Sequence, residues 1–288
     1  MGKFKKSVSL LTYGLNEEEA LPSFLDYAFD LLSSTVEDFE IIFVDDGSYD
    51  RTPTILKEYA SRDHRLKIVT HPHNMNVGFA LRSAINNATK DYIFWQTVDC
   101  SYELKYLSIF LKLLESYDVV QGVRPIPIRL FTYIPLLKSI HRVKTRSDNF
   151  WKAIVSLINY YTIRILFAAP FSDFQNVTFY KTEFLHSLPL SGTSSFVNPE
   201  CLLRAYYKGA RVIEVPISFT KRTKGLSKGT KLSSIFKSCY DIISSWLNWG
   251  LMKRLQNNPI GKIYKVSTPF DLNEETIKIC APLFKEFL

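Results

Sequence analysis

Two adjacent carboxylates, Asp45 and Asp46, follow directly after an apolar, β-branched run at residues 41–44. A turn residue, Gly47, and a capping residue, Ser48, come next, and a helix is expected to follow. A buried parallel strand delivers acids in this way to the carboxyl edge of a sheet, where open α/β folds bind their ligands. Carboxylates at that edge can hydrogen-bond a base or a ribose, or hold a divalent cation. The structural alternative is a strand end closed by an Asx-turn.

Alternating strands and helices must position these acids. Hydrophobic periodicity predicts strands at residues 8–13, 39–45, 66–70, 92–97 and 118–122, and helices at residues 17–33, 52–61, 77–88 and 103–116. Asn16 is expected to cap the first helix. Strict alternation favours an α/β fold with a doubly wound, mostly parallel, Rossmann-like sheet. No GxGxxG follows the first strand and no GxxxxGK(S/T) occurs, which argues against a dinucleotide-binding phosphate loop and a P-loop NTPase.

The pattern changes after Gly122, where a basic, proline-containing stretch begins. We expect helices at residues 150–167, 199–208, 232–249 and 273–287, strands at 173–180 and 211–220, and a basic loop at 221–231. Pro216 interrupts the second of these strands and places it at an edge or a bend. The apolar stripe of helix 232–249 favours packing on its own domain, with a membrane surface as the alternative. Asn159 and Arg164 interrupt the apolar segment 153–171, which argues against a transmembrane span.

The net charge of +8 is concentrated in the second half of the chain. Residues 121–165 contain eight Lys or Arg against one acid, and residues 203–231 contain eight more against Glu214 alone. This surplus implies an anionic partner such as a phosphorylated substrate, phospholipid headgroups or nucleic acid, with a solvated basic face as the alternative. The basic residues do not interleave with stacking aromatics, so no nucleic-acid partner is expected.

Cysteine usage and the amino terminus bear on location. The four cysteines are widely spread and form no CxxC pair, which indicates reduced thiols rather than a zinc site. The basic start of the chain lacks the apolar length and the small-residue cleavage site of a signal peptide. We therefore expect a cytoplasmic protein, with peripheral association at the inner face of the cell membrane as the open alternative.

Further motifs occur in order between residues 8 and 228. They are Asn74-Met75-Asn76-Val77-Gly78, Gly122-Val123-Arg124, the helix face of Lys152, Ser156 and Asn159, Asp173-Phe174-Gln175, Glu200, Glu214-Val215-Pro216, and Arg222, Gly225, Ser227 and Lys228. Together with Asp45-Asp46, this order resembles the inverting family-2 glycosyltransferases of the GT-A fold. The resemblance is greatest to the branch that contains dolichol- and polyprenyl-phosphate sugar synthases.

The chain departs from that family's pattern at two places. Tyr13-Gly14-Leu15-Asn16-Glu17 stands where the family has Pro-x-Tyr-Asn-Glu, and Thr97-Val98-Asp99 stands where it has the metal-binding Asp-x-Asp. Thr97 can hydrogen-bond but brings no charge, so the change predicts a weaker metal affinity, an altered sugar preference or a loss of activity. Asp99 can still coordinate a divalent cation that bridges a diphosphate.

The resemblance implies a donor site. Nucleotide-sugar binding is assigned to Tyr13, Glu17, Asp45, Asp46, Thr97, Asp99, Arg124 and Lys228. Asp99 and Ser101 are the expected ligands of Mn²⁺ or Mg²⁺. Arg124, Arg222 and Lys228 would stabilise the negative charge that develops on the leaving diphosphate. Arg222 is counted with the catalytic residues.

The resemblance also implies a reaction, the inverting transfer of a sugar from a nucleotide-diphosphate-sugar to a polyprenyl phosphate or a cell-surface glycan. A phosphate acceptor is already an anion, whereas a hydroxyl acceptor needs a base, for which Asp173 is the first choice and Glu200 the second. Structurally, Asp173 can cap a turn and Glu200 can favour a helix start. Residues 1–230 are expected to form the GT-A domain, and residues 231–288 a helical, basic extension packed on or beside it. A catalytically weakened sugar-nucleotide-binding protein is the alternative, because of Thr97.

Overall fold

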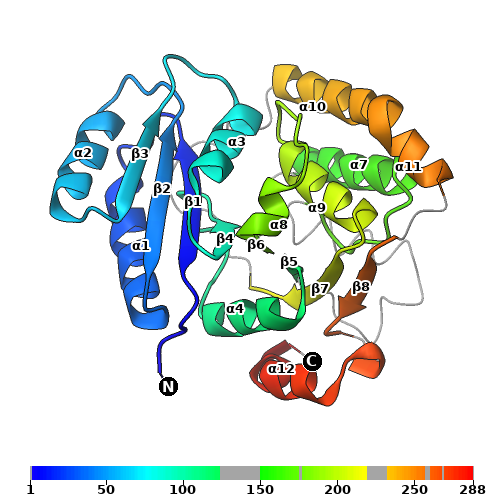
Figure 1. The fold of residues 1–288 in the computed structure, drawn as a ribbon. Coiled ribbons are helices and arrows are strands. Elements are labelled where there is room, and N and C mark those ends of the chain that lie inside the picture. The colour runs from blue at the N-terminus through cyan, green and yellow to red at the C-terminus, as the bar shows by residue number, and fades with distance from the viewer. Residues whose placement is uncertain are drawn as a thin grey trace.

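The computed structural model describes residues 2–123, 150–174, 177–218, 232–256, 260–267 and 269–287, with the backbone alone at 150–154 and 232–233. Its centre is an eight-stranded sheet in the order β3-β2-β1-β4-β6-β5-β7-β8 (Figure 1). The strands are β1 (Val8–Gly14), β2 (Phe39–Asp45), β3 (Leu66–Thr70), β4 (Tyr92–Trp95), β5 (Val119–Val123), β6 (Thr178–Lys181), β7 (Arg211–Pro216) and β8 (Lys262–Lys265). All pair in parallel except β6, which runs antiparallel to β4 and β5. The predicted doubly wound, mostly parallel sheet is confirmed.

Helices cover both faces of this sheet. They are α1 (Leu21–Thr35), α2 (Thr52–Arg62), α3 (Val77–Asn87), α4 (Leu107–Ser116), α7 (Phe150–Leu166), α8 (Thr182–His186), α9 (Val197–Tyr207), α10 (Leu232–Ser245), α11 (Leu251–Leu255) and α12 (Glu274–Phe287), with a π-helix at Trp246–Gly250 and a 3₁₀ turn at Pro269–Asp271. Along β2, Ile41 and Phe43 join the core beneath α1, α2, α4 and α12, while Ile42 and Val44 join the core beneath α3, α7 and α9. The strand is apolar at successive positions because both of its faces are buried.

The start of α1 differs from the prediction. The helix begins at Leu21, so Asn16 is not its cap. Asn16 instead has a left-handed φ of 54°, and its side-chain oxygen accepts a hydrogen bond from the amide of Tyr49. A short asparagine side chain tolerates this conformation and ties the β1–α1 loop to the β2–α2 loop.

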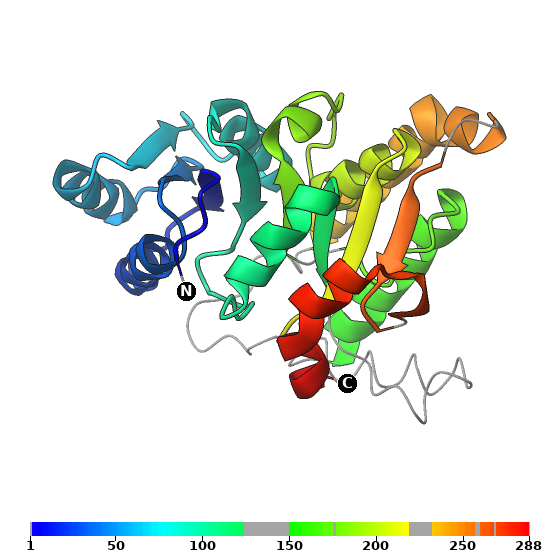
Figure 2. The same ribbon diagram turned by 60° about the horizontal axis from the view of Figure 1, so that its bottom comes forward.

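One feature near the carboxyl terminus also differs from the prediction. β7 was expected at an edge or a bend, but it lies between β5 and β8, and Pro216 is its last residue. The edge position is wrong because the short strand β8 covers β7. α12 packs beside α4 (Figure 2), where Lys105 and Tyr106 both contact the carboxylate of Glu286. The tail is therefore integrated with the sheet and its helices.

α10 does not pack in the predicted way. Ile242 is buried in the core, and a Cβ at Gly250 would lie 2.5 Å from the ring of Phe167, so this side of the helix approaches α7 closely. The predicted apolar stripe lies on the outer side instead, where Phe236 and Tyr240 are exposed. Among the described residues, no helix combines the length and hydropathy needed to cross a membrane.

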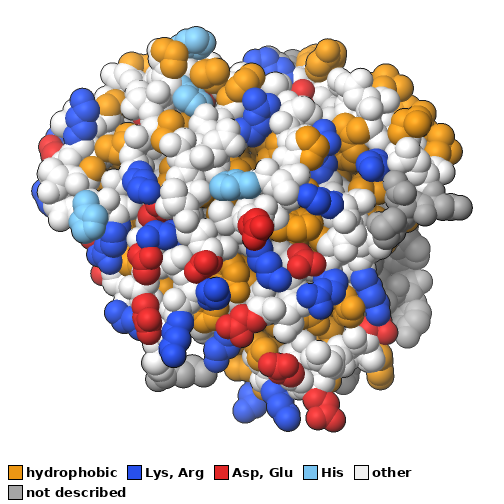
Figure 3. All heavy atoms as spheres, in the orientation of Figure 1, with side chains coloured by type: hydrophobic (Ala, Val, Ile, Leu, Met, Phe, Trp, Pro, Cys, Tyr) orange, Lys and Arg blue, Asp and Glu red, His pale blue; other side chains and the backbone are white. Residues whose placement is uncertain are grey.

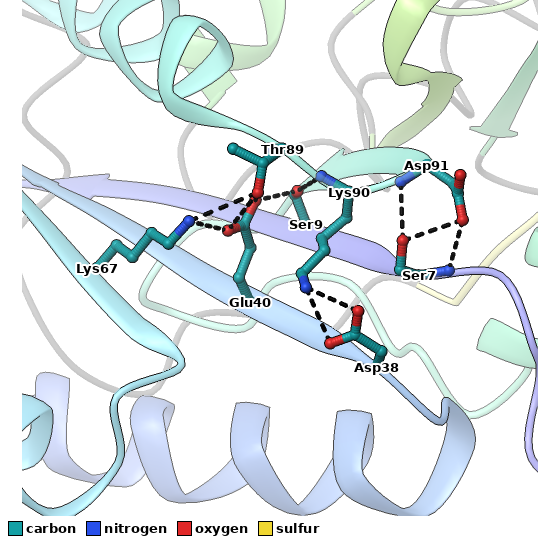
Figure 4. A network of polar contacts seen from close by, with 8 residues as sticks. All are labelled: Ser7, Ser9, Asp38, Glu40, Lys67, Thr89, Lys90 and Asp91. Carbon is teal, nitrogen blue, oxygen red and sulfur yellow. Dashed lines mark hydrogen bonds and ion pairs between the residues drawn. The ribbon is translucent and has the colours of Figure 1, made fainter.

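A polar network ties the amino-terminal ends of the strands together (Figure 4). The carboxylate of Glu40 is buried, accepts hydrogen bonds from Ser9 Oγ (2.7 Å) and Thr89 N (2.7 Å), and pairs with Lys67 Nζ at 2.5 Å. Burial alone would raise the pKa of Glu40, but these contacts outweigh it and the pKa is lowered. The amino edge of the sheet is therefore a neutralised structural cluster, whereas the opposite edge carries the predicted site.

Candidate functional site

The site forms where β1, β2 and β4 reach the carboxyl edge of the sheet (Figure 1). Gly14 at the end of β1 pairs with Asp45 at the end of β2. On the other side of β1, the amide of Gln96 donates to the carbonyl of Leu11 (3.1 Å), so the segment that follows β4 continues beside β1 toward Asp99. Asp45 therefore ends the strand on one side of β1, and the turn that contains Asp99 follows the strand on its other side.

Asp45 closes the turn at the end of β2. Its carboxylate accepts a hydrogen bond from the amide of Ser48 (3.0 Å), which is the turn that the sequence allowed as the structural alternative. Gly47 has a φ of +81°, and a Cβ there would lie 2.7 Å from the backbone of His73. The β2–α2 turn and the loop after β3 thus lie so close together that any side chain at position 47 would clash with the backbone of His73.

Asp46 points into the loop between β3 and α3. Its carboxylate accepts hydrogen bonds from the amides of Met75 (2.9 Å) and Asn76 (3.1 Å), and it contacts His71 Nδ1 at 2.8 Å. The other ring nitrogen of His71 lies 2.9 Å from Ser83 Oγ, and the ring is buried. Asp46 is therefore a positioning residue for the β3–α3 loop.

The Thr97-Val98-Asp99 segment forms a tight turn after β4. Thr97 Oγ1 donates to Asp99 Oδ1, which also accepts from the amide of Ser101 (3.3 Å). Cys100 has a left-handed φ of 47°, and burial, together with the charge of Asp99, raises the pKa of its thiol to about 11. The turn thus presents one carboxylate and two hydroxyl-bearing side chains, all hard oxygen donors.

The oxygen donors of this turn form only part of a cation site. The described residues contain no cluster of three or more His, Cys, Asp or Glu that could hold a metal alone. Mg²⁺-like ions are, however, commonly bound through one or two carboxylates together with the phosphates of a substrate. Asp99 with Thr97 and Ser101 fits a cation whose coordination a diphosphate completes.

Tyr13 links this turn to α9, across the sheet edge. Burial raises the pKa of its phenol to about 12, a hydrogen bond with Asn198 opposes the shift, and the charge of Asp99 adds to it. Asn198 therefore lies at the site, although the sequence analysis did not select it. Its one sequence signal is that it precedes Glu200 by two positions. Glu17 also lies here, because a Cβ on Gly14 would meet its side chain at 2.8 Å.

Asp173 lies at the same edge, near the end of β5. It is almost fully buried, its carboxylate accepts from the amide of Phe174 (2.8 Å), and its carbonyl accepts from Gln121 Nε2 on β5 (2.6 Å). The preceding residue, Ser172, donates to Glu214 through both its amide (2.6 Å) and its hydroxyl (2.5 Å). Glu214 is the residue that holds the Asp173 segment in place, a role that sequence reasoning missed.

The carboxyl group of Glu214 is buried, and its neighbours offset only part of the effect of burial on its pKa. Burial raises the pKa of its carboxyl, while Lys265 on β8 and the contacts with Ser172 oppose that shift. Lys265 Nζ lies 3.4 Å from Glu214 and 3.1 Å from Ser172 Oγ. The tail strand β8 therefore contributes a cation to the support of the Asp173 segment.

Glu200, the second candidate base, is fully buried on α9. Its oxygens accept hydrogen bonds from Gly192 N (2.6 Å), Ser191 Oγ (2.9 Å) and Arg204 Nε (2.7 Å). This carboxylate therefore anchors the loop before α9. The arrangement favours the structural alternative for Glu200 and leaves Asp173 as the better candidate base. Arg124, Gln175, Arg222 and Lys228 and the side chain of Lys152 lie outside the described residues.

A family model described as glycosyl transferase family 2 matches residues 9–174, more than half of the chain. This chain belongs to glycosyl transferase family 2. The match spans β1 through the Asp173 segment and so includes every described residue of the site edge except Asn198 and Glu214.

Two curated relatives are similar over part of this family-2 chain. A putative glycosyltransferase of Bacillus subtilis, EpsH, is 33% identical over 106 residues, which are 37% of this chain and 30% of the relative. A dolichyl-phosphate β-glucosyltransferase of Trichomonas vaginalis, ALG5D, is 32% identical over 97 residues, which are 32% of this chain and 30% of the relative. The alignments thus cover under a third of the length of both relatives.

Solved structures share the GT-A fold with this chain. A mannosyltransferase of Pyrobaculum calidifontis in complex with GDP-Man and Mn²⁺ superposes with a TM-score of 0.52 at 15% identity, over 86% of this chain and 66% of the other. Glucosyl-3-phosphoglycerate synthase of Mycobacterium tuberculosis gives a TM-score of 0.55 at 18% identity, over 84% of this chain and 80% of the other. A further crystal structure of that synthase contains Mn²⁺, UDP-Glc and phosphoglyceric acid. At these identities the likeness establishes the fold.

Proposed function

We propose that this family-2 protein transfers a sugar, with inversion, from a nucleotide-diphosphate-sugar to a polyprenyl phosphate or a glycan acceptor. The observation that carries the proposal is that Asp45 ends β2 and Asp99 lies in the turn after β4, because these two strands flank β1 at the carboxyl edge of the sheet. Ligands of open α/β sheets bind at this edge. The GDP-Man and UDP-Glc complexes of the structural neighbours support a donor of this class, and the dolichyl-phosphate relative supports a lipid-phosphate acceptor.

Different site residues are proposed to bind the nucleoside and the diphosphate of the donor. In the proposal, Asp45 and Glu17 receive the nucleoside, Asp46 holds the Met75–Asn76 backbone in place for it, and Tyr13 lies beside the diphosphate. Asp99 with Thr97 and Ser101 would hold Mn²⁺ or Mg²⁺ together with the two phosphates. When bound, that cation supplies positive charge to offset the negative charge of the departing diphosphate. Arg124, Arg222 and Lys228, known here only from the sequence, are proposed to add to that charge.

The acceptor decides whether a base is needed. A phosphate acceptor attacks as an anion, so no side chain has to remove a proton. A hydroxyl acceptor has to lose its proton to a carboxylate, and Asp173 is the candidate, held by Glu214 through Ser172. In an inverting reaction the acceptor oxygen attacks the anomeric carbon, the bond from that carbon to the diphosphate oxygen breaks, and the configuration reverses in one step.

A transfer assay tests the proposal. Purified protein is incubated with Mn²⁺, UDP-Glc or GDP-Man, and either a short polyprenyl phosphate or an oligosaccharide, and the anomeric configuration of the product is read by NMR. Inverted product on either acceptor supports the proposal, whereas retained configuration or no product with any donor and acceptor contradicts it. With Asp173→Asn, transfer to the phosphate is expected to persist, and transfer to a hydroxyl is expected to fall by about 100-fold or more.

Thr97 favours a second candidate, a sugar-nucleotide-binding protein with weakened catalysis. The position offers a hydroxyl where a second carboxylate would add charge for the cation. Tight donor binding by calorimetry, combined with neither transfer nor hydrolysis, would support this candidate. Restoration of turnover by Thr97→Asp would identify the missing carboxylate as the cause.

A further inference from the structure

α10 carries a continuous apolar stripe on its outer side. Phe236 and Tyr240 are 72% and 73% exposed, and Ile243 and Leu247 follow at the same helical spacing and are more than half exposed. Steps of four, three and four residues place side chains on one face of an α-helix. The stripe is therefore an amphipathic face that nothing in the described part of the chain buries.

The π-helix at Trp246–Gly250 keeps the stripe in phase as it passes into α11. A π-helix is bonded between residues five positions apart, and Met252 follows Leu247 by five positions. Leu255 then follows one α-helical turn later and is 70% exposed. We call these six residues, from Phe236 to Leu255, the outer stripe. Figure 3 shows hydrophobic side chains gathered where α10 and α11 lie in Figure 1.

The outer stripe continues onto α7. The guanidinium of Arg254 donates to the carbonyls of Ile165 (3.0 Å) and Leu166 (3.3 Å), so the carboxyl ends of α7 and α11 meet. Ile165 is 66% exposed at this junction, and Ile158 is similarly exposed two turns earlier along α7. A shallow apolar hollow of about 430 Å³ lies along these α7 residues. The exposed apolar surface therefore extends over several helices, and patches of that kind on monomers mark interaction sites.

The charged side chains on the same helices are basic, with one exception. The described side chains of residues 155–166 and 234–255 include four Lys or Arg and a single acid, Asp241. That acid is buried and accepts hydrogen bonds from the amides of Thr193 (2.8 Å) and Ser194 (2.7 Å), so it offers no charge to a partner. The surface formed by α7, α10 and α11 therefore combines apolar side chains with cations. The described residues of these helices place no exposed acid on it.

We propose that the outer stripe with the α7 face docks this protein onto an anionic lipid bilayer. An interfacial helix buries its apolar side at the boundary of headgroups and acyl chains, while neighbouring Lys and Arg contact the phosphates. A second copy of this chain is a poorer partner, because two such faces would bring cations together without acids to pair with them. A bilayer supplies both an apolar layer and negative charge.

The docking face is connected to the site edge. Asp241 of α10 holds the Thr193–Ser194 loop, and the carbonyl of Thr193 accepts a hydrogen bond from Gly78 at the start of α3 (3.2 Å). Lys237 Nζ lies 3.3 Å from Asn76 Oδ1. Docking would thus present the carboxyl edge of the sheet near the membrane surface. This inference goes beyond the proposed function and does not require it, since a glycan acceptor is also compatible with a docked enzyme.

Vesicle flotation tests the inference without any sugar substrate. The full chain is mixed with vesicles of phosphatidylcholine alone, or of phosphatidylcholine with phosphatidylglycerol. We expect binding to the anionic vesicles that weakens with salt and with Lys253→Glu. The triple variant Phe236→Ser, Tyr240→Ser, Leu247→Ser should lower the partition coefficient by about tenfold or more. Phe270→Ser, which removes a 97% exposed aromatic from the 3₁₀ turn before α12, is the matched control and should bind like the wild type.

Three outcomes would overturn the inference. They are a wild type that binds neither kind of vesicle, a triple variant that binds as well as the wild type, and a stripe-dependent dimer seen by sedimentation velocity. Thermal unfolding checks that the variants fold. Should the triple variant fail to fold, Phe236→Ser serves instead as a single change, because this side chain is 72% exposed on α10. Donor titrations in vesicle-free buffer separate a failure of docking from a failure of the proposed function.

Discussion

Replacing Glu200 by glutamine tests whether this carboxylate anchors a loop or acts as a base. The side chain is fully buried and accepts hydrogen bonds from Ser191, Gly192 and Arg204. Glutamine keeps one oxygen and turns the other acceptor into a donor. Replacing Oε1 loses the bonds from Ser191 Oγ and Arg204 Nε, and replacing Oε2 loses the bond from Gly192 N. At about 1.5 kcal/mol for each hydrogen bond to a charged group, the free energy of unfolding should fall by about 1.5 to 3 kcal/mol.

Urea and thermal unfolding measure this change, and turnover per folded molecule is measured in parallel. The loss corresponds to a decrease of roughly 3 to 12 °C in Tm, with turnover close to that of the wild type. Glu183→Gln, an exposed glutamate in the first turn of α8, is the control and should change neither quantity. An unchanged Tm combined with a loss of about 100-fold or more in turnover would refute the reasoning, because that is the signature of a missing general base.

Three further predictions follow from particular contacts. Gly78→Ala should destabilise the fold by about 2 kcal/mol in urea unfolding, because its Cβ would lie 2.3 Å from the backbone of Thr193; Gly2→Ala, with nothing within 4 Å, is the control. The pKa of Glu40 is lower in the folded protein than its usual value of 4.5, so Glu40 stabilises the fold above pH 4.5 and loses that effect as the pH falls through its folded pKa. Glu40→Gln should therefore lower the free energy of unfolding at pH 7 and reduce its decrease at acid pH. An unchanged dependence of this free energy on pH would contradict the prediction. Tyr13 has a pKa of about 12, so its phenol stays neutral below pH 10. Tyr13→Phe should therefore weaken donor binding by roughly tenfold at most and leave the pH dependence of donor binding unchanged. A shift in that pH dependence would contradict the prediction.

The sheet could be predicted well from the sequence because its strands are buried on both faces. The predicted bounds of β2 and β3 match the structure, since a run such as Ile41–Val44 between polar residues leaves little choice. β8 could not be predicted, because Lys262–Lys265 is four residues long and carries a lysine at each end. Its strand conformation depends on pairing with β7, a partner that no local pattern reveals.

The candidate site was predictable in position but less so in the roles of its acids. Asp45 and Asp99 lie at the carboxyl edge because each follows a predicted strand. Asp46 and Glu200 were singled out as acids, but a sequence does not show which backbone amides will fold against them. Asn198 was missed for the same reason, since its contact with Tyr13 joins residues from opposite halves of the chain.

The account rests on Asp99 as the residue that holds the donor diphosphate together with a divalent cation. Isothermal titration of UDP-Glc and GDP-Man into wild type and Asp99→Asn, each with and without Mn²⁺, tests it most directly, with Asp30→Asn on the exposed side of α1 as the control. We predict that Mn²⁺ strengthens binding of one of these donors to the wild type and to Asp30→Asn, and that the strengthening is absent in Asp99→Asn. An equal effect of Mn²⁺ on all three proteins, or no donor binding by the wild type, would contradict the account.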